Sequence, residues 1–349
     1  MGRRWLSFLI VCCLLFFLLS SIFGFDLYRL LYQPMLVEKN KSDIVRVDRS
    51  MSATSFAHTL KTKKLIQSDQ LFITLIRIQG FTERLKAGIY RIREGESAQQ
   101  FLYRVVAGDV LIESFSIIEG TTQRQVSEHL SQAEFLNYRD NDWINIEKPG
   151  QNSLSSELPI SAEGLLLADT YHYDAGSTGK DLLIQAHAKL KEYLDSSWLQ
   201  RSPGLPYKTL YELLIVASIL EKEAANPDEK RLISGVIVNR LNKKMPLQMD
   251  PTVIYALGSQ YKGKLSREDL QVDSPYNSYR YRGLPPTPIA MVGKDAIDAA
   301  AHPKSTSFLY FVARGDGGHQ FSVTYDQQRQ AIARYLGQHA PEGAPKENK

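Results

Sequence analysis

The chain begins with an apolar run from Trp5 to Phe25 that contains no charged side chain. A helix of about 20 apolar residues is long enough to cross the hydrocarbon core of a bilayer. The run is longer than the apolar stretch of about 7–15 residues in signal peptides, and no small-residue cleavage site follows it. The sequence therefore predicts an uncleaved transmembrane helix over residues 5–25, with a cleaved signal peptide as the alternative.

The charges beside this run predict its orientation. Arg3 and Arg4 lie in the short segment 1–4 that precedes it, and positively charged flanks favour the cytoplasm. No second apolar run of similar length follows. We expect a single-pass protein with a cytoplasmic N-terminus, whose residues beyond 26 lie outside the cytoplasm.

Composition excludes several kinds of site from the remaining chain. The 42 basic and 38 acidic side chains give a net charge of +4, which is too small an excess to indicate nucleic-acid binding. The two cysteines, Cys12 and Cys13, are adjacent and lie inside the apolar run. A disulfide framework and a cysteine metal site are therefore excluded from the exported part, and we expect neither a metal nor a cofactor.

Periodicity predicts a mixed α+β protein. After a juxtamembrane helix and linker (26–43), three segments each combine an alternating strand, a polar turn and an amphipathic helix. Because such units bury little apolar surface alone, we expect them to pack together as one small domain. Their strands are 45–47, 88–92 and 115–118, and their helices open at Ser52, Ser97 and Thr121, which are residue types that cap helices well.

The rest of the chain is predicted to be mainly helical. Residues 137–160 are polar and are predicted to form an irregular connection. Apolar periodicity then predicts helices over 180–199, 210–225, 229–242 and 326–336, and a hairpin that pairs 309–312 with 321–323.

Glu221 is the most unusual titratable residue. It follows eight uncharged residues (213–220), and in a helix it shares a face with Leu214, Ala217 and Ser218. Partial burial would raise the pKa of this carboxyl group and let it hold a proton near neutral pH.

Two further points bear on Glu221. Glu223 lies about 200° away around a helix of about 3.6 residues per turn, so the two carboxylates cannot act as a close pair. The alternative interpretation of Glu221 is a solvated acid at the helix end, paired with Lys222 or Arg240.

Beyond residue 244 the chain combines proline, tyrosine and amide side chains. Proline stiffens loops, while tyrosine and asparagine offer planar faces and amide hydrogen bonds that suit sugar rings. With the segments before them, these motifs resemble the endolytic murein transglycosylase (YceG-like) family. The resemblance spans residues 44 to 336 and rests on AEG at 162–164, DTY at 169–171, ASILEKE at 217–223, NRL at 239–241, LQMDPTVIY at 247–255, YNSY at 276–279, GLPP at 283–286, AAAHP at 299–303 and GGHQF at 317–321.

The resemblance implies a domain organisation and a catalytic residue. It implies a LysM-like module at 44–118, a catalytic domain at 119–340 and a flexible tail at 341–349. The first glutamate of the Glu-Lys-Glu motif, Glu221, is implied as the catalytic acid. Ala168 stands where the family usually has proline, and Ala224 stands where threonine is common.

The implied reaction is cleavage of the β-1,4 bond between N-acetylmuramic acid and N-acetylglucosamine in nascent peptidoglycan strands, which leaves 1,6-anhydro ends and stops strand elongation. A hydrolase needs two carboxylates, whereas a lytic transglycosylase needs one. We hypothesise that substrate contacts come from Gln248, Asp250, Tyr255, Tyr276, Asn277 and Glu163.

The implied location is the inner membrane, with a periplasmic catalytic domain. The expected partners are peptidoglycan glycan strands and peptidoglycan synthases. Two alternatives remain open at this point: a non-enzymatic glycan-binding scaffold of the wall-synthesis machinery, and a hydrolytic muramidase.

Overall fold

The computed structural model describes residues 2–35, 43–146, 161–224 and 226–336. The chain divides into two compact units. Unit 1 comprises Met1–Glu113, Glu134–Asn137 and His172–Ser177, and unit 2 comprises Ser114–Ala133, Tyr138–Tyr171 and Thr178–Lys349. The predicted tail, part of the linker and residues 147–160 of the predicted irregular connection lie outside the described residues.

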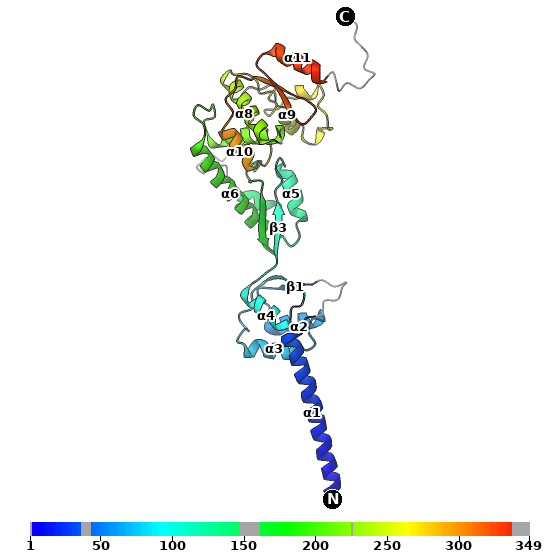
Figure 1. Cartoon of the computed structure of the whole chain (residues 1–349). Helices are drawn as coiled ribbons and strands as arrows, with labels where there is room; N and C mark the ends of the chain where they lie inside the picture. Colours follow the sequence, from blue (N-terminus) through cyan, green and yellow to red (C-terminus); the bar gives the residue numbers. More distant parts are fainter. Residues whose placement is uncertain (1, 36–42, 147–160, 225, 337–349) are drawn as a thin grey trace, which may run out of the picture. The chain divides into compact units, whose positions relative to one another are not determined.

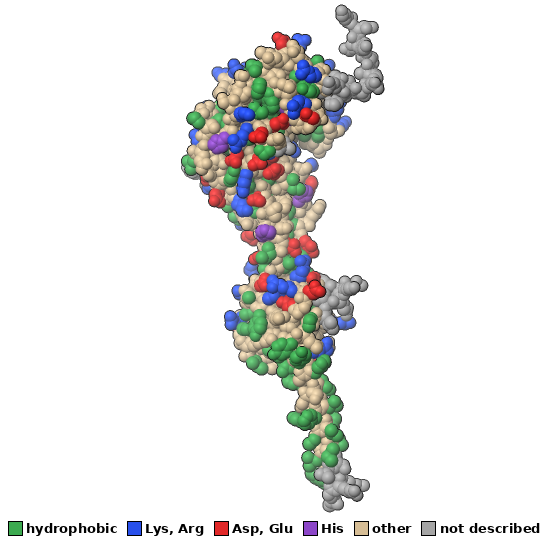
Figure 2. All heavy atoms as spheres, viewed as in Figure 1, with side chains coloured by type: hydrophobic (Ala, Val, Ile, Leu, Met, Phe, Trp, Pro, Cys, Tyr) green, Lys and Arg blue, Asp and Glu red, His purple; other side chains and the backbone are tan. Residues whose placement is uncertain are grey.

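Unit 1 opens with the helix α1 (Gly2–Tyr32), which is longer than the predicted 5–25. Its stretch Phe8–Tyr32 is long and apolar enough to cross a membrane, a test that a signal sequence also passes. Apolar side chains are exposed along it (Figure 2). The last turn enters the unit, where Leu30 and Met35 join the buried core.

Three more helices and a two-stranded sheet complete this core (Figure 1). β1 (Ile44–Val47) pairs antiparallel with β2 (Gly88–Arg91), with Val45 opposite Tyr90. The helices are α2 (Ala53–Thr62), α3 (Asp69–Ile78) and α4 (Ala98–Ala107). The predicted caps Ser52 and Ser97 each accept a hydrogen bond from the backbone three residues later, while α3 was not predicted.

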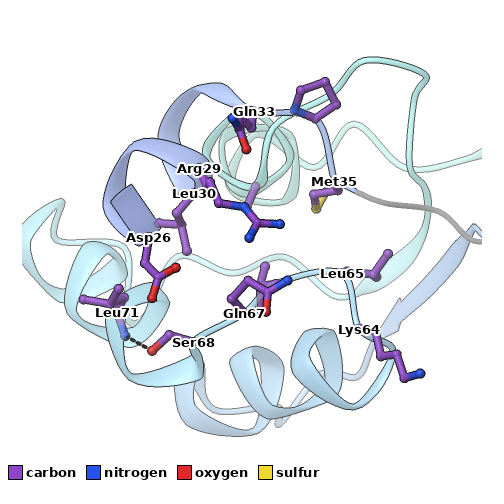
Figure 3. Close-up of a pocket in the computed structure, with 13 residues that line it drawn as sticks. Asp26, Arg29, Leu30, Gln33, Met35, Lys64, Leu65, Gln67, Ser68 and Leu71 are labelled. Carbon is purple, nitrogen blue, oxygen red and sulfur yellow. Dashed lines mark hydrogen bonds between the residues drawn. The ribbon is translucent and has the colours of Figure 1, made fainter. Parts of the chain in front are cut away.

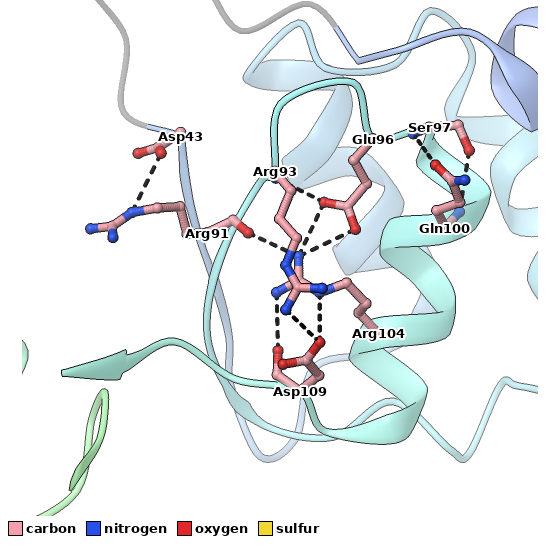
Figure 4. A network of polar contacts seen from close by, with 8 residues as sticks. All are labelled: Asp43, Arg91, Arg93, Glu96, Ser97, Gln100, Arg104 and Asp109. Carbon is pink, nitrogen blue, oxygen red and sulfur yellow. Dashed lines mark hydrogen bonds and ion pairs between the residues drawn. The ribbon is translucent and has the colours of Figure 1, made fainter. Parts of the chain in front are cut away.

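A buried ionic network ties α4 to the loops of unit 1 (Figure 4). The Arg104 guanidinium donates to both oxygens of the Glu96 carboxylate, which in turn accepts from the Arg93 backbone N–H. Arg104 also pairs with Asp109 at 3.0 Å, and its positive charge holds the pKa of that carboxyl group below its usual range. Because the charges are paired and hydrogen-bonded, they can lie beside the apolar core.

The third predicted strand–helix segment does not pair with the first two. Its strand β3 (Ile112–Ser116) pairs with β4 (Thr170–Asp174), which was not predicted, and its helix α5 (Gln123–Gln132) belongs to unit 2. Thr122 caps α5, one residue later than expected. A LysM-like identity for residues 44–118 stays a prediction.

Unit 2 is mainly helical. A short 3-10 helix, η1 (Asp140–Asn145), precedes the long α6 (Gly179–Gln200), and the core contains α7 (Leu210–Glu223), α8 (Pro227–Asn242) and α10 (Lys294–Ala301). Helix α9 (Asp250–Leu257), η2 (Gly258–Gln260) and η3 (Asp269–Gln271) lie in the proline- and tyrosine-rich region. The hairpin β5 (Tyr310–Ala313) and β6 (His319–Ser322) and the closing helix α11 (Tyr325–Leu336) agree with prediction.

Candidate active site

The candidate site surrounds the C-terminal end of α7. Thr209 caps this helix by accepting a hydrogen bond from the Glu212 N–H, and every residue from 213 to 220 is buried. Ser218 Oγ accepts a hydrogen bond of 3.0 Å from Ile289 N, which ties the helix to the loop before α10. The last turn of α7, with Glu221 and Glu223, is therefore anchored by a buried helix.

Glu221 is buried, but it has a partner that the sequence analysis did not identify. Its Oε1 accepts a hydrogen bond from Lys230 Nζ at 2.5 Å, and both side chains are only 3% exposed. Its Oε2 accepts a hydrogen bond of 2.7 Å from Gly293 N. The two cations expected near it, Lys222 and Arg240, donate instead to backbone carbonyls. Glu221 is thus the anion of a buried ion pair.

Gly293 fits tightly between two carboxylates. A Cβ atom at this position would lie 2.0 Å from Glu119 Oε1, so a larger residue would require the Glu119 side chain to move. Partial burial raises the pKa of Glu119, and the negative charge of Glu221 adds to the rise. These contacts fix the loop before α10 against the end of α7.

Glu223 lies in different surroundings, on another face of the same helix as predicted. Burial raises its pKa to about 8, and the negative charge of Asp250 adds to the rise. Among the described residues, no hydrogen bond or ion pair engages its carboxyl group. A carboxyl group with such a pKa is mostly protonated at neutral pH and is available as a proton donor.

Asp250 and Tyr279 lie near Glu223. Asp250 opens α9, where Pro251 is tolerated because the first backbone N–H groups of a helix have no partner within it. Tyr279 Oη donates a hydrogen bond of 2.5 Å to Asp250 Oδ1. The neighbouring Gln248 is exposed in a left-handed conformation (φ 50°), and its amide oxygen accepts a hydrogen bond from Arg240.

A second cluster links Glu163 to two tyrosines. Glu163 is 4% exposed, and its oxygens accept hydrogen bonds from Gln123 N at 2.8 Å and from Tyr255 Oη at 3.2 Å. Burial raises its pKa to about 7. The rings of Tyr255 and Tyr276 pack with centroids 4.8 Å apart, and the Tyr276 hydroxyl contacts Thr287 Oγ1.

Asn277 does not take the position expected of a substrate contact. Its side chain is fully buried, and its Nδ2 donates hydrogen bonds to the carbonyls of Leu270 and Val272. Its Oδ1 accepts a hydrogen bond from Tyr279 N. Asn277 therefore holds the loop that carries Tyr276 and Tyr279, which corrects the expectation of a direct sugar contact.

Lys230 and Tyr279 are the two residues that the sequence analysis missed. A signal for Lys230 was present, because it shares the buried stripe of α8 with Ile233 and Ile237 at helical spacing. A lysine on such a stripe needs a buried partner. Within the described ranges, no group of three or more His, Cys, Asp or Glu side chains is arranged to hold a metal ion.

Comparisons with known proteins find relatives over most of the chain. The YceG-like family model matches residues 45–334. The endolytic murein transglycosylase of Bacillus subtilis (strain 168) is 27% identical over 323 residues, which cover 88% of each chain. The enzyme of the same name from Streptococcus pneumoniae (strain D39) is 27% identical over 87% of this chain and 60% of its own length.

A solved structure gives the same result at the level of the fold. The crystal structure of a yceG-like protein from Listeria monocytogenes matches 82% of this chain and 97% of its own, with 26% identity and a TM-score of 0.53. The two chains are therefore similar in both sequence and fold. Because the family model spans most of both units, this chain belongs to the YceG-like family.

Proposed function

We propose that this protein is a membrane-anchored lytic transglycosylase that cleaves the bond between N-acetylmuramic acid and N-acetylglucosamine in peptidoglycan. The names of its relatives supply the substrate class. The observation that carries the proposal is Glu223, a carboxyl group with a pKa of about 8 and without a partner among the described residues. It is supported by tyrosines of the kind that pack against sugar rings.

In the proposed mechanism Glu223 acts twice. The protonated carboxyl group donates its proton to the glycosidic oxygen as the bond from that oxygen to C1 of the muramic acid breaks. The Glu223 carboxylate then takes the proton of the C6 hydroxyl group of the same sugar, and the C6 oxygen bonds to C1. The products are a free 4-hydroxyl group and a 1,6-anhydro ring, and Glu223 regains its proton. No water is consumed.

This assignment moves the catalytic role from Glu221 to Glu223. Glu221 already accepts hydrogen bonds from Lys230 and Gly293, so its proton-accepting positions are occupied and both partners would lose their acceptor if it were protonated. Breaking a buried ion pair costs several kcal/mol, typically about 3–5. Glu221 is instead a positioning residue, which holds α7 against α8 and the Gly293 loop.

The other expected site residues receive distinct roles. Asp250 raises the pKa of Glu223, and Tyr279 orients Asp250 by its hydrogen bond. We propose that the exposed Gln248 and the half-buried rings of Tyr255 and Tyr276 contact the sugar chain. Glu163, which is buried, acts through the Tyr255 hydroxyl group.

Further proposals concern the membrane location of the protein, its module at 44–118 and its partners. We infer that α1 anchors the protein in the inner membrane with residues 1–4 in the cytoplasm and both units in the periplasm. Residues 44–118 are proposed as a LysM-like glycan-binding module, and peptidoglycan synthases as partners in strand termination.

Digestion of purified peptidoglycan followed by mass spectrometry tests the activity. Lytic cleavage gives muropeptides with 1,6-anhydro ends. Reducing ends would overturn the proposal in favour of a muramidase, for which Asp250 is the second carboxylate near Glu223. Glycan binding without cleavage would favour a non-enzymatic scaffold.

A further inference from the structure

A charged pocket of unit 1 lies where α1 enters the folded part of the unit (Figure 3). Its walls are the last two turns of α1 with the residues that follow to Met35, the segment 64–71, and Ala98 at the start of α4. The segment 64–71 comprises the loop after α2 and the first residues of α3. The polar side chains that matter for the argument are Asp26, Arg29, Gln33, Gln67 and Ser68.

The pocket lies at a defined depth along α1. The apolar run ends at Phe25, and the helix continues without a break to Tyr32. At about 1.5 Å per residue, Arg29 is about 6 Å beyond Phe25, which is within the headgroup layer when the apolar run fills the hydrocarbon core. Because Leu30 and Met35 are buried in the core of unit 1, the pocket has a fixed position on α1.

Among the described residues, Asp26 and Arg29 in this pocket have no hydrogen-bonded or ionic side-chain partner. The third charged residue of the lining, Lys64, is directed away from the centre of the pocket (Figure 3). Asp26 and Arg29 are one helical turn apart, yet they do not form an ion pair within 4.0 Å. In the described part of the chain, the contact of the Arg29 guanidinium is with the Phe25 ring, 5.7 Å from its centroid. Figure 3 shows Asp26, Arg29 and Gln67 directed towards the centre of the pocket.

The size and charge of the pocket define its ligand. The cavity of about 40 Å³ has room for roughly three water molecules, so it can enclose part of a polar headgroup and cannot enclose an acyl chain. A guanidinium binds phosphate through paired hydrogen bonds, and a carboxylate binds an ammonium group. A ligand with only negative charge would meet Asp26.

We propose that this pocket binds the headgroup of one zwitterionic phospholipid that carries a phosphate and a primary ammonium group, with Arg29 on the phosphate and Asp26 on the ammonium. This proposal rests on α1 lying in a membrane, which belongs to the proposed function. It does not depend on the transglycosylase activity.

Native mass spectrometry of the full chain in detergent tests the proposal. The protein is mixed with equal amounts of phosphatidylethanolamine, phosphatidylcholine and phosphatidylglycerol of the same acyl chains. We expect one phosphatidylethanolamine to be retained, at least about tenfold more strongly than either other lipid, since hydrogen bonds to charged groups are involved. The choline headgroup cannot donate hydrogen bonds, and the glycerol headgroup lacks the ammonium.

Variants identify the site. Arg29→Gln and Asp26→Asn should each reduce this retention by about tenfold. The matched control is Arg77→Gln, because Arg77 is an exposed arginine of α3 that does not line the pocket. Thermal melts of each variant show whether unit 1 stays folded.

The results that would overturn the headgroup site differ from those that would overturn the proposed transglycosylase activity. Equal retention of the three lipids, preference for phosphatidylglycerol, or unchanged retention by folded Arg29→Gln would each overturn the headgroup site. Extraction of the protein from membranes at high pH would overturn the anchor, and with it this inference. Neither result depends on whether peptidoglycan is cleaved.

Discussion

Replacing each glutamate of the Glu-Lys-Glu motif by glutamine separates the two roles that the structure suggests. Glu223→Gln keeps the size of the side chain but removes its acid and base functions. General acid–base catalysis is worth about 10²–10⁴-fold, and here one group serves two proton transfers, so we expect a loss of at least about 10³-fold in cleavage rate. The fold should be unaffected or more stable.

The stability effect follows from the pKa of Glu223. Its rise from 4.5 to about 8 in the folded chain corresponds to at most about 5 kcal/mol, an upper limit because solvent screens this half-buried side chain. The folded state holds a proton that the unfolded state releases, so the free energy of unfolding falls as the pH rises from about 4.5 to 8. Glutamine lacks this penalty, and the variant's advantage should grow over the same range.

Glu221→Gln should behave in the opposite way. It leaves the Lys230 ammonium buried without its anion, which costs about 3–5 kcal/mol. We expect a lower melting temperature. At temperatures where the variant is still folded, we expect some cleavage activity to remain. Glu192→Gln, an exposed acid on α6, is the matched control.

The assay measures release of anhydro-muropeptides by the three purified variants, with thermal melts at pH 5 and pH 8. Full activity in folded Glu223→Gln would refute the assignment to Glu223. A stable Glu221→Gln protein without any activity would return the catalytic role to Glu221.

Four further predictions follow from the same contacts. The rate of cleavage should fall as the pH rises through about 8, because Glu223 must be protonated, and a pH–rate profile that is flat to pH 10 would contradict this. Asp250→Asn removes a negative charge that raises the pKa of Glu223, so the alkaline limb of that profile should move to lower pH. Lys230→Met should lower the melting temperature, and combining it with Glu221→Gln should restore much of the loss, as a double-mutant cycle of melts will show. Intact-mass measurement of the membrane fraction should find a chain that retains residues 1–25; a chain that begins near Asp26 would indicate a cleaved signal.

Much of the local structure was predictable because its causes are local. The caps Ser52 and Ser97 act on backbone groups three residues away, and the hairpin before α11 has alternating strands around a glycine-rich turn. The helix predicted over 229–242 begins two residues earlier, at Pro227. Helix α9 was not predicted, because proline is common in loops. Proline is also favoured in the first turn of a helix, which is where Pro251 lies.

The candidate site was less predictable because its contacts link distant segments. Apolar neighbours correctly indicated that Glu221 is buried, but its partners Lys230 and Gly293 come from α8 and from the loop before α10. The raised pKa of Glu223 likewise depends on Asp250, which follows two helices later. Helical periodicity shows which face a residue occupies and does not show what another element brings to that face.

The two glutamates depend on each other through their charges. A single group that first donates and then accepts a proton works best when its pKa is near the working pH. An unpaired negative charge at Glu221, two residues away, would raise the pKa of Glu223 further and weaken it as the acid of the first step. Lys230 neutralises Glu221 inside the protein, while Asp250 alone adds a negative charge on the other face. In the proposed mechanism the buried ion pair would therefore do more than hold two helices together, because it leaves burial and Asp250 as the causes of the raised pKa of Glu223.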